Sequence, residues 1–173
     1  MSLNHFITAL AVIVIFPLFL NACSEEEWPE GCLYGEIILP NFNDPDTPGA
    51  YFDFSEGEIV FGEEGRLRGD IYLEQTFIKG NPEHEIGLHD EQPDSLLYKR
   101  SAPSWGSARW KVSPNPGVPP SVPLYEGHNI WVRTAEGHTA KFKILTMESN
   151  ENHTSYNWIK IRWIYQPDGS TSF

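Results

Sequence analysis

The stretch from 129 to 166 constrains the fold most, because apolar and polar side chains alternate along three successive segments. Segments 129–134, 139–145 and 156–165 all follow a period of two, which is the side-chain period of a β-strand. Short turns are expected between them, at 135–138 and 148–154. The stretch therefore predicts an antiparallel three-stranded meander with one face in a core.

The composition of the chain favours strands and turns over helices. It has 173 residues with 14 Gly and 14 Pro, and it is rich in aromatic and β-branched residues. We expect a mostly β, single-domain antiparallel fold that buries roughly two-thirds of its unfolded surface. The net charge of -12 works against nucleic-acid binding, which needs basic patches.

The N-terminal residues predict a secretory leader. The apolar run 6–20 is too short for a comfortable transmembrane helix but suits the hydrophobic region of a signal. The run ends at 20–23, Leu-Asn-Ala-Cys, which resembles the lipobox of bacterial lipoproteins and implies acylation of Cys23. We therefore expect a signal peptide over 1–22, a lipidated Cys23 with an acidic tether over 23–31, and a β domain over 32–173. A soluble-secretion signal and an uncleaved anchor helix remain alternatives.

Two further features lie close to the predicted anchor. The acidic run 24–27 resembles the sorting stretch of surface lipoproteins of the Bacteroidota, or it is a solvated tether. Acylation of Cys23 would leave Cys32 as the only thiol, expected to be a buried small side chain. Without acylation, a Cys23–Cys32 disulfide is the alternative.

The middle of the chain predicts further strands and one long irregular segment. A strand is expected at 33–39, a hairpin from 51–54 and 58–61, and another strand at 70–78 with Ile71, Leu73 and Phe77 facing the core. From 80 to 127, eight prolines interrupt the pattern, so long irregular loops are expected. So long a segment is usually functional or partly disordered, which makes it the expected place of a site.

Two separated groups of residues resemble one protein family. Residues 51–60, followed by Asp70-Ile71, resemble the opening strands of HmuY-like haem-binding surface lipoproteins, and 131–142 with 165–169 resembles their closing meander. The resemblance implies an HmuY-type β fold and capture of haem or a related porphyrin. Two positions depart from the family pattern: Gly69 stands where a Trp is usual, and Glu74 where a His would be expected.

The resemblance implies a haem site but does not carry over its ligands. Haem iron takes neutral His or Met donors, an apolar slot and cations for the propionates. The preferred ligand candidates, in or beside the irregular segment, are His84, His89 and His128; His138, His153 and Met147 are the other donors. Candidates for the pocket and the propionates are Lys99, Arg100, Trp105, Arg109 and Trp110. Implied partners are the outer membrane, through the lipid anchor, and a TonB-dependent transporter.

Other functions remain as alternatives. A non-haem surface lipoprotein of the same fold could bind a protein or glycan through the aromatic faces of its sheet and the loops 80–127. The segment 84–90 carries imidazoles and carboxylates that could hold zinc or calcium, although its histidines lack the HExxH spacing. The sequence has no GxSxG elbow, phosphate-binding Gly loop or CxxC pair, so we do not expect an enzyme.

Overall fold

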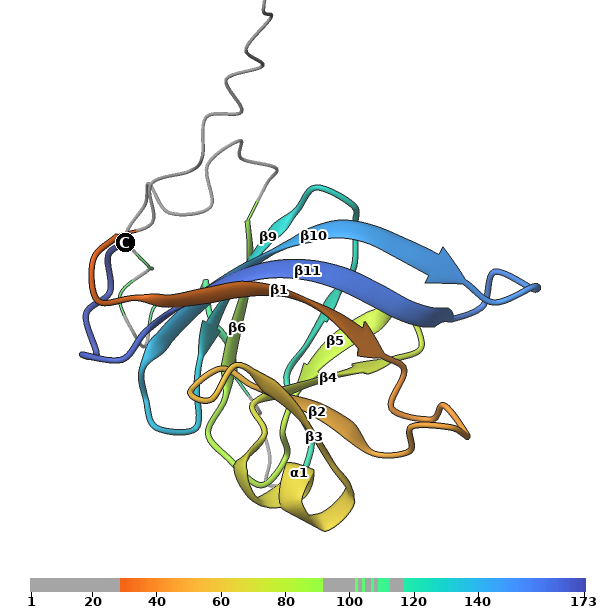
Figure 1. Ribbon diagram of the computed structural model, residues 1–173. Coiled ribbons are helices and arrows are strands. Elements are labelled where there is room, and N and C mark those ends of the chain that lie inside the picture. The colour runs from red at the N-terminus through yellow and green to blue at the C-terminus, as the bar shows by residue number, and fades with distance from the viewer. Residues whose placement is uncertain (1–28, 92–101, 103, 105–106, 108, 113–116) are drawn as a thin grey trace, which may run out of the picture.

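The computed structural model describes residues 29–91, 102, 104, 107, 109–112 and 117–173. Two antiparallel β-sheets pack against each other, with one short helix below them in Figure 1. The six-stranded sheet has the order β1-β11-β10-β9-β6-β7, and the five-stranded sheet the order β3-β2-β4-β5-β8. The prediction of a mostly β, antiparallel fold is confirmed. The elements are β1 (Leu33–Pro40), β2 (Ala50–Asp53), β3 (Glu58–Phe61), α1 (Gly62–Arg68), β4 (Ile71–Glu74), β5 (Phe77–Gly80), β6 (Gly87–Glu91), β7 (Lys111–Val112), β8 (Ser121–Pro123), β9 (Asn129–Arg133), β10 (Thr139–Ser149) and β11 (Tyr156–Gln166).

The main core lies between the two sheets and is rich in aromatic rings. Phe52 on β2 packs edge-to-face on Trp163 of β11, with ring centroids 5.3 Å apart. Phe54 stacks on Phe142 of β10 at 6.2 Å. Because such rings bury large apolar areas, these contacts hold the sheets together. Within the part of the chain that the structure describes, no helix has the length and hydropathy needed to cross a membrane.

The predicted C-terminal meander is confirmed. β10 pairs with both β9 and β11, and its pairing with β11 extends over eleven-residue strands. The side chains of Ile130, Val132 and Phe142 are fully buried in the main core, as the alternation predicts. These strands form the centre of the six-stranded sheet, and β1 pairs along the far side of β11.

The single strand predicted over 70–78 is wrong, because the chain reverses in its middle. β4 and β5 form a tight hairpin in which Gln75 has a φ of 57°. In this hairpin Leu73 is opposite Ile78, and both are fully buried, whereas Phe77 is only half-buried. An alternating pattern does not reveal a two-residue turn that lacks Gly, Asn or Asp.

The segment 80–127 is more regular than the prolines suggest. It contributes β6, β7 and β8, and β6 lies between β9 and β7 in the six-stranded sheet. Pro123 pairs with Phe77 at the edge strand β8, a position where the missing N–H of proline is tolerated. The helix α1 was also not predicted; at seven residues it is too short to show a helical period.

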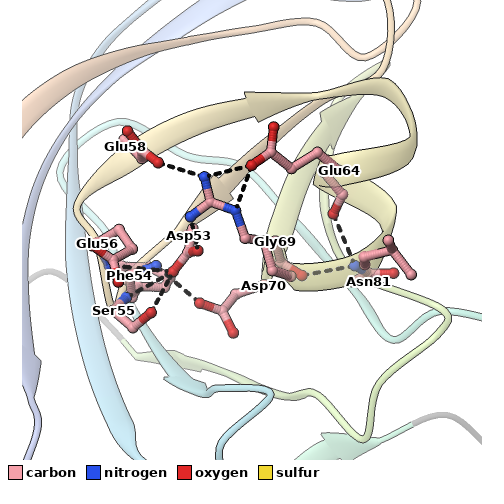
Figure 2. A network of polar contacts seen from close by, with 12 residues as sticks. Asp53, Phe54, Ser55, Glu56, Glu58, Glu64, Gly69, Asp70 and Asn81 are labelled. Carbon is pink, nitrogen blue, oxygen red and sulfur yellow. Dashed lines mark hydrogen bonds and ion pairs between the residues drawn. The ribbon is translucent and has the colours of Figure 1, made fainter.

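A polar network joins the short helix to the five-stranded sheet, as Figure 2 shows. Arg68, at the end of α1, forms ion pairs with Asp53, Glu58 and Glu64. Asp53 is nearly inaccessible and also accepts hydrogen bonds from the backbone N–H and the hydroxyl of Ser55. The buried carboxylate is thus compensated on both of its oxygens.

Two further buried residues connect separate parts of the backbone. The side-chain Nδ2 of Asn81 donates to the carbonyl oxygens of Gly65, Arg66 and Gly69, near the end of α1 (Figure 2). The Asp70 carboxyl accepts the backbone N–H of Phe54 at 2.9 Å. It also accepts the backbone N–H of Ala135, in the turn between β9 and β10, at 2.8 Å. Asp70 therefore joins a turn of one sheet to a turn of the other.

Candidate functional site

The candidate site lies on the six-stranded sheet where β6 and β9 run side by side. In the strand register His89 is opposite Trp131, and Trp131 is opposite Lys141 of β10. Residues directly opposite each other in an antiparallel pair project to the same face, so these side chains form one row. We call the face that carries this row, which points away from the five-stranded sheet, the outer face.

His89 is held in one tautomer by the backbone. Its Nδ1 lies 3.1 Å from the carbonyl oxygen of Arg109. Because a carbonyl oxygen only accepts, Nδ1 carries the proton and Nε2 presents its lone pair. Histidines that bind metals commonly have this arrangement, which orients the ring and raises its basicity as a ligand.

The side chains around His89 combine apolar walls with a cation. The ring of Trp110 lies 6.3 Å from the imidazole, centroid to centroid, and Val112 on the edge strand β7 is 44% exposed. Arg133 is the next residue of β9 that projects to the outer face after Trp131, and it is half-buried. A flat, partly apolar anion would therefore find both contact area and a positive charge beside the imidazole.

A buried ion pair lies in the same row. Lys141 is fully buried, with its Nζ 3.0 Å from Oε2 of Glu91 and 4.5 Å from the centre of the Trp131 ring. The indole N–H of Trp131 donates to the same Glu91 oxygen at 3.1 Å, and Phe173 stacks on the indole at 5.5 Å. A buried ammonium needs such partners. The outer face therefore contains a packed layer of its own.

The structure does not bring the three preferred ligands together. The Nδ1 of His128 lies 3.0 Å from a carboxylate oxygen of Asp90. Asp90 follows His89 in β6, and successive strand residues point to opposite faces, so His128 lies on the inner side. The Nε2 of His84 lies 2.9 Å from the carbonyl oxygen of Leu67, at the end of α1.

The remaining predicted site residues divide into two groups. The ring of Trp110 and the backbone carbonyl of Arg109 lie beside His89, whereas Arg109 itself is exposed and no contact of its guanidinium with His89 is among those of the described residues. Lys99, Arg100, Trp105 and Cys23 lie outside the described residues.

The other donors named from the sequence lie in other parts of the molecule. The Nδ1 of His138 lies 2.7 Å from the hydroxyl of Tyr165, and Met147 packs against the main core. His153 lies in the turn between β10 and β11. Among the residues that are described, no group of three or more His, Cys, Asp or Glu could hold a metal ion.

Cys32 is a half-buried free thiol next to β1. Its Sγ donates to the side-chain oxygen of Gln166 on β11. Burial, with a smaller contribution from Asp168, raises the pKa of the thiol above its usual value. Because the thiolate is the reactive form, Cys32 is a poor nucleophile.

Sequence reasoning missed the buried pair of Lys141 and Glu91. The alternation over 139–145 puts Lys141 on the face opposite the core-facing residues, but it does not indicate that this side chain is fully buried. The available signal was the Trp at 131, an unusually large apolar residue on the polar side of its strand.

Gly69 explains one departure from the family pattern. A Cβ atom at this position would lie 2.4 Å from the Cβ of Tyr51 and 2.8 Å from the carbonyl oxygen of Gly65. Real Cβ atoms essentially never approach other atoms this closely. Therefore the local packing of this chain excludes a Trp side chain there.

The fold and the site together define a two-sheet antiparallel β protein with a histidine, aromatic rings and an arginine on one outer sheet face. The chain is similar in structure to HmuY-like and lipoprotein structures from the Bacteroidota. The HmuY analogue of Tannerella forsythia, solved without ligand, matches at 10% identity and a TM-score of 0.45, covering 79% of this chain and 97% of that one.

Two more solved structures match in the same range. A protein described as a candidate lipoprotein from Bacteroides fragilis has 10% identity and a TM-score of 0.41, covering 77% of this chain and 89% of its own. A candidate HmuY-like haem-binding protein from Bacteroides vulgatus has 13% identity and a TM-score of 0.38, covering 77% and 92%. Matches at this level carry no argument about what this chain binds. No protein-family model and no curated protein matches the sequence.

Proposed function

We propose that the protein captures haem or a related porphyrin on the outer face of its six-stranded sheet, with His89 as the iron ligand. The observation that carries this proposal is the convergence of His89, Arg109 and Trp110, which come from β6 and from the segment before β7. Bound haem would supply an iron that accepts the lone pair of an imidazole. The His89 Nε2 is the atom that would donate it, because Nδ1 is engaged by the backbone.

The surrounding residues suit the rest of the macrocycle. Val112 offers exposed apolar surface next to the nearly buried ring of Trp110, and Arg133, whose guanidinium lies 3.9 Å from Glu85, would place a cation near a propionate. Since His84 and His128 contact other parts of the molecule, the proposal uses one protein histidine rather than two. A single histidine is a sufficient protein ligand for haem iron in several classes of haem protein.

The proposal extends to the place where the protein acts. Acylation of Cys23 would tether the domain to the outer membrane, with the acidic residues 24–27 as a solvated spacer. A surface-anchored porphyrin carrier without catalytic activity would pass its cargo to a TonB-dependent transporter. Labelling with palmitate would test the anchor independently of haem. We expect the wild-type protein to incorporate the label and Cys23→Ala to lose it.

Titration of the purified protein with haemin tests the ligand assignment. We expect a saturable one-to-one change of the Soret band in the wild-type protein and in His84→Ala, and its loss in His89→Ala. His84 is the matched control because its ring is also bonded to a backbone carbonyl oxygen, at a different place in the molecule.

Three results would overturn the assignment. A wild-type spectrum that does not differ from free haemin would remove the porphyrin function. A spectrum lost equally in His84→Ala and His89→Ala would show that the imidazoles act non-specifically. A loss confined to His128→Ala would move the ligand to the inner side of the sheet.

A further inference from the structure

An open pocket of about 410 Å³ lies where the ends of the two sheets meet. It is formed by the connection after β1, the β4–β5 turn, the β10–β11 turn and the beginning of β11. In Figure 1 the connection after β1 and the β10–β11 turn lie at the right, whereas β1 begins and the chain ends at the left. None of the residues that line the pocket belongs to the outer-face site around His89. Its lining residues are Asn41, Asn43, Asp44, Pro45, Gln75, Asn150, Ser155, Tyr156 and Asn157.

Backbone hydrogen bonds between three connections hold the pocket in shape. The N–H of Asn41 donates to the carbonyl of Asn157 at 2.8 Å, and the N–H of Tyr156 donates to the carbonyl of Gln75 at 2.9 Å. The side-chain amide of Asn41 donates to the Tyr156 carbonyl at 2.7 Å. Because these bonds tie the lining segments to one another, a ligand would meet a preorganised surface.

Several polar groups of the lining are available to a ligand. Asn43, Gln75 and Asn157 are exposed. Among the hydrogen bonds of the described residues, none engages the side-chain amides of Asn43 or Gln75. Each primary amide offers two donors and an acceptor, the pattern that matches a hydroxyl group, which both donates and accepts.

The charge and the apolar content of the lining narrow the ligand class. Asp44 is the only charged residue of this lining, and no Lys, Arg or His accompanies it, so anionic ligands are disfavoured. The apolar contribution is limited to Pro45 and the ring of Tyr156, which excludes a ligand driven mainly by hydrophobic burial. What remains is a small, neutral, polyhydroxylated molecule.

We propose that this pocket binds a neutral sugar unit, with the amides of Asn43, Gln75 and Asn157 and the carboxylate of Asp44 contacting its hydroxyl groups. The volume is in the lower part of the range of small-molecule sites and suits one or two sugar rings. This site is independent of the proposed porphyrin site, because the two share no residue.

Saturation-transfer difference NMR on the purified protein without haem tests the proposal. The probes are the methyl glycosides of glucose, galactose, mannose and N-acetylglucosamine, with glucuronate as the anionic analogue of glucose. We expect millimolar binding of at least one neutral glycoside and much weaker binding of glucuronate, because its carboxylate would face Asp44.

Variants locate the binding. Asn43→Ala combined with Gln75→Gly should weaken binding by roughly 10- to 100-fold, since each lost hydrogen bond costs about 2- to 12-fold. Both changes spare the fold: these amides have no partner among the described residues, and glycine readily adopts the φ of 57° at position 75. Asn152→Ala is the matched control, because Asn152 is exposed in the neighbouring turn but does not line the pocket.

The outcomes of this experiment either support the sugar site or overturn it. Signal lost in the double variant and kept in Asn152→Ala supports the site. No transfer to any neutral glycoside at about 20 mM, far above the millimolar affinity expected here, would overturn it. Equal signals in the double variant and the wild type would do the same. Neither failure would touch the haemin titration, which reports on His89.

Discussion

The buried carboxyl of Asp70 makes a specific prediction for the pH dependence of stability. Asp70 is inaccessible to solvent, its two oxygens accept the N–H groups of Phe54 and Ala135, and none of the ion pairs among the described residues involves it. Burial raises the pKa of Asp70 to about 8, against the opposing effect of the two N–H donors. In the unfolded chain an Asp titrates at about 3.9.

The direction in which the free energy of unfolding changes with pH depends on whether the folded or the unfolded chain holds the proton. Between about pH 4 and pH 8 the folded carboxyl holds a proton that the unfolded chain has released, so unfolding releases one proton. The free energy of unfolding should therefore fall as the pH rises through this window, by at most about 1.4 kcal/mol per pH unit. Between about pH 5 and pH 8 the loss amounts to roughly 4 kcal/mol, a large fraction of the stability of an ordinary domain.

Urea denaturation of wild-type protein and Asp70→Asn over this range measures the effect. Asparagine cannot titrate, and its NH₂ group faces one of the two backbone donors, which costs about 1–3 kcal/mol at every pH. Because the wild-type protein loses roughly 4 kcal/mol over this range and the variant costs only about 1–3 kcal/mol, the wild-type protein should be the more stable of the two near pH 5 and the less stable near pH 8. Asp46→Asn, at an exposed carboxyl, is the control for the charge change.

A constant difference between wild-type protein and Asp70→Asn from pH 5 to pH 8 would refute the reasoning. It would mean that the two N–H donors outweigh the cost of burial and keep Asp70 ionised in the folded protein. A slope shared by Asp46→Asn and the wild-type protein, but absent from Asp70→Asn, would assign the proton to this carboxyl.

Three further substitutions test the buried contacts. Lys141→Met should lower the free energy of unfolding, measured by urea denaturation, by about 3–5 kcal/mol, because it removes the ammonium partner of Glu91. Adding Glu91→Gln should restore most of this loss, and a double variant without restoration would contradict the pairing. Asn81→Ala should cost about 2–3 kcal/mol in thermal unfolding, since it removes the donor to three carbonyl oxygens; a loss below about 0.5 kcal/mol would show that water replaces the amide. Gly69→Ala should cost at least about 2 kcal/mol by differential scanning calorimetry, because its Cβ would clash with Tyr51, and an unchanged melting temperature would contradict this packing.

Local periodicity predicts most of the scaffold. Residues 129–166 form the expected meander, and the hairpin of 51–54 with 58–61 matches β2 and β3 closely, because alternation and a Gly-containing turn are both local signals. The β4–β5 turn was missed, since Gln75 adopts a positive φ without the usual turn residues. β6 was missed because Leu88 is the only one of its five residues with a buried side chain, which gives no alternation to detect.

The site was predictable only in part, for a related reason. The residue types that a porphyrin needs were found in the segment 80–127, and His89, Arg109 and Trp110 do lie together. His84 contacts the end of α1, and His128 contacts Asp90 on the inner side of the sheet. Both positions depend on contacts between distant segments, which the residues near each histidine do not predict. The polar pocket draws its lining from three connections far apart in sequence, and no motif joins them.

The outer face shows why alternation alone misjudges such a sheet. Period two tells which side chains share a face, but it does not tell what covers that face. In this chain Phe173 stacks on Trp131, and the Lys141 side chain is buried beside it. An exposed lysine in that row would be an ordinary solubilising residue. Because Lys141 is instead buried beside the Trp131 ring, its ammonium group requires Glu91 as a partner, and burial changes the physical role of both charged residues.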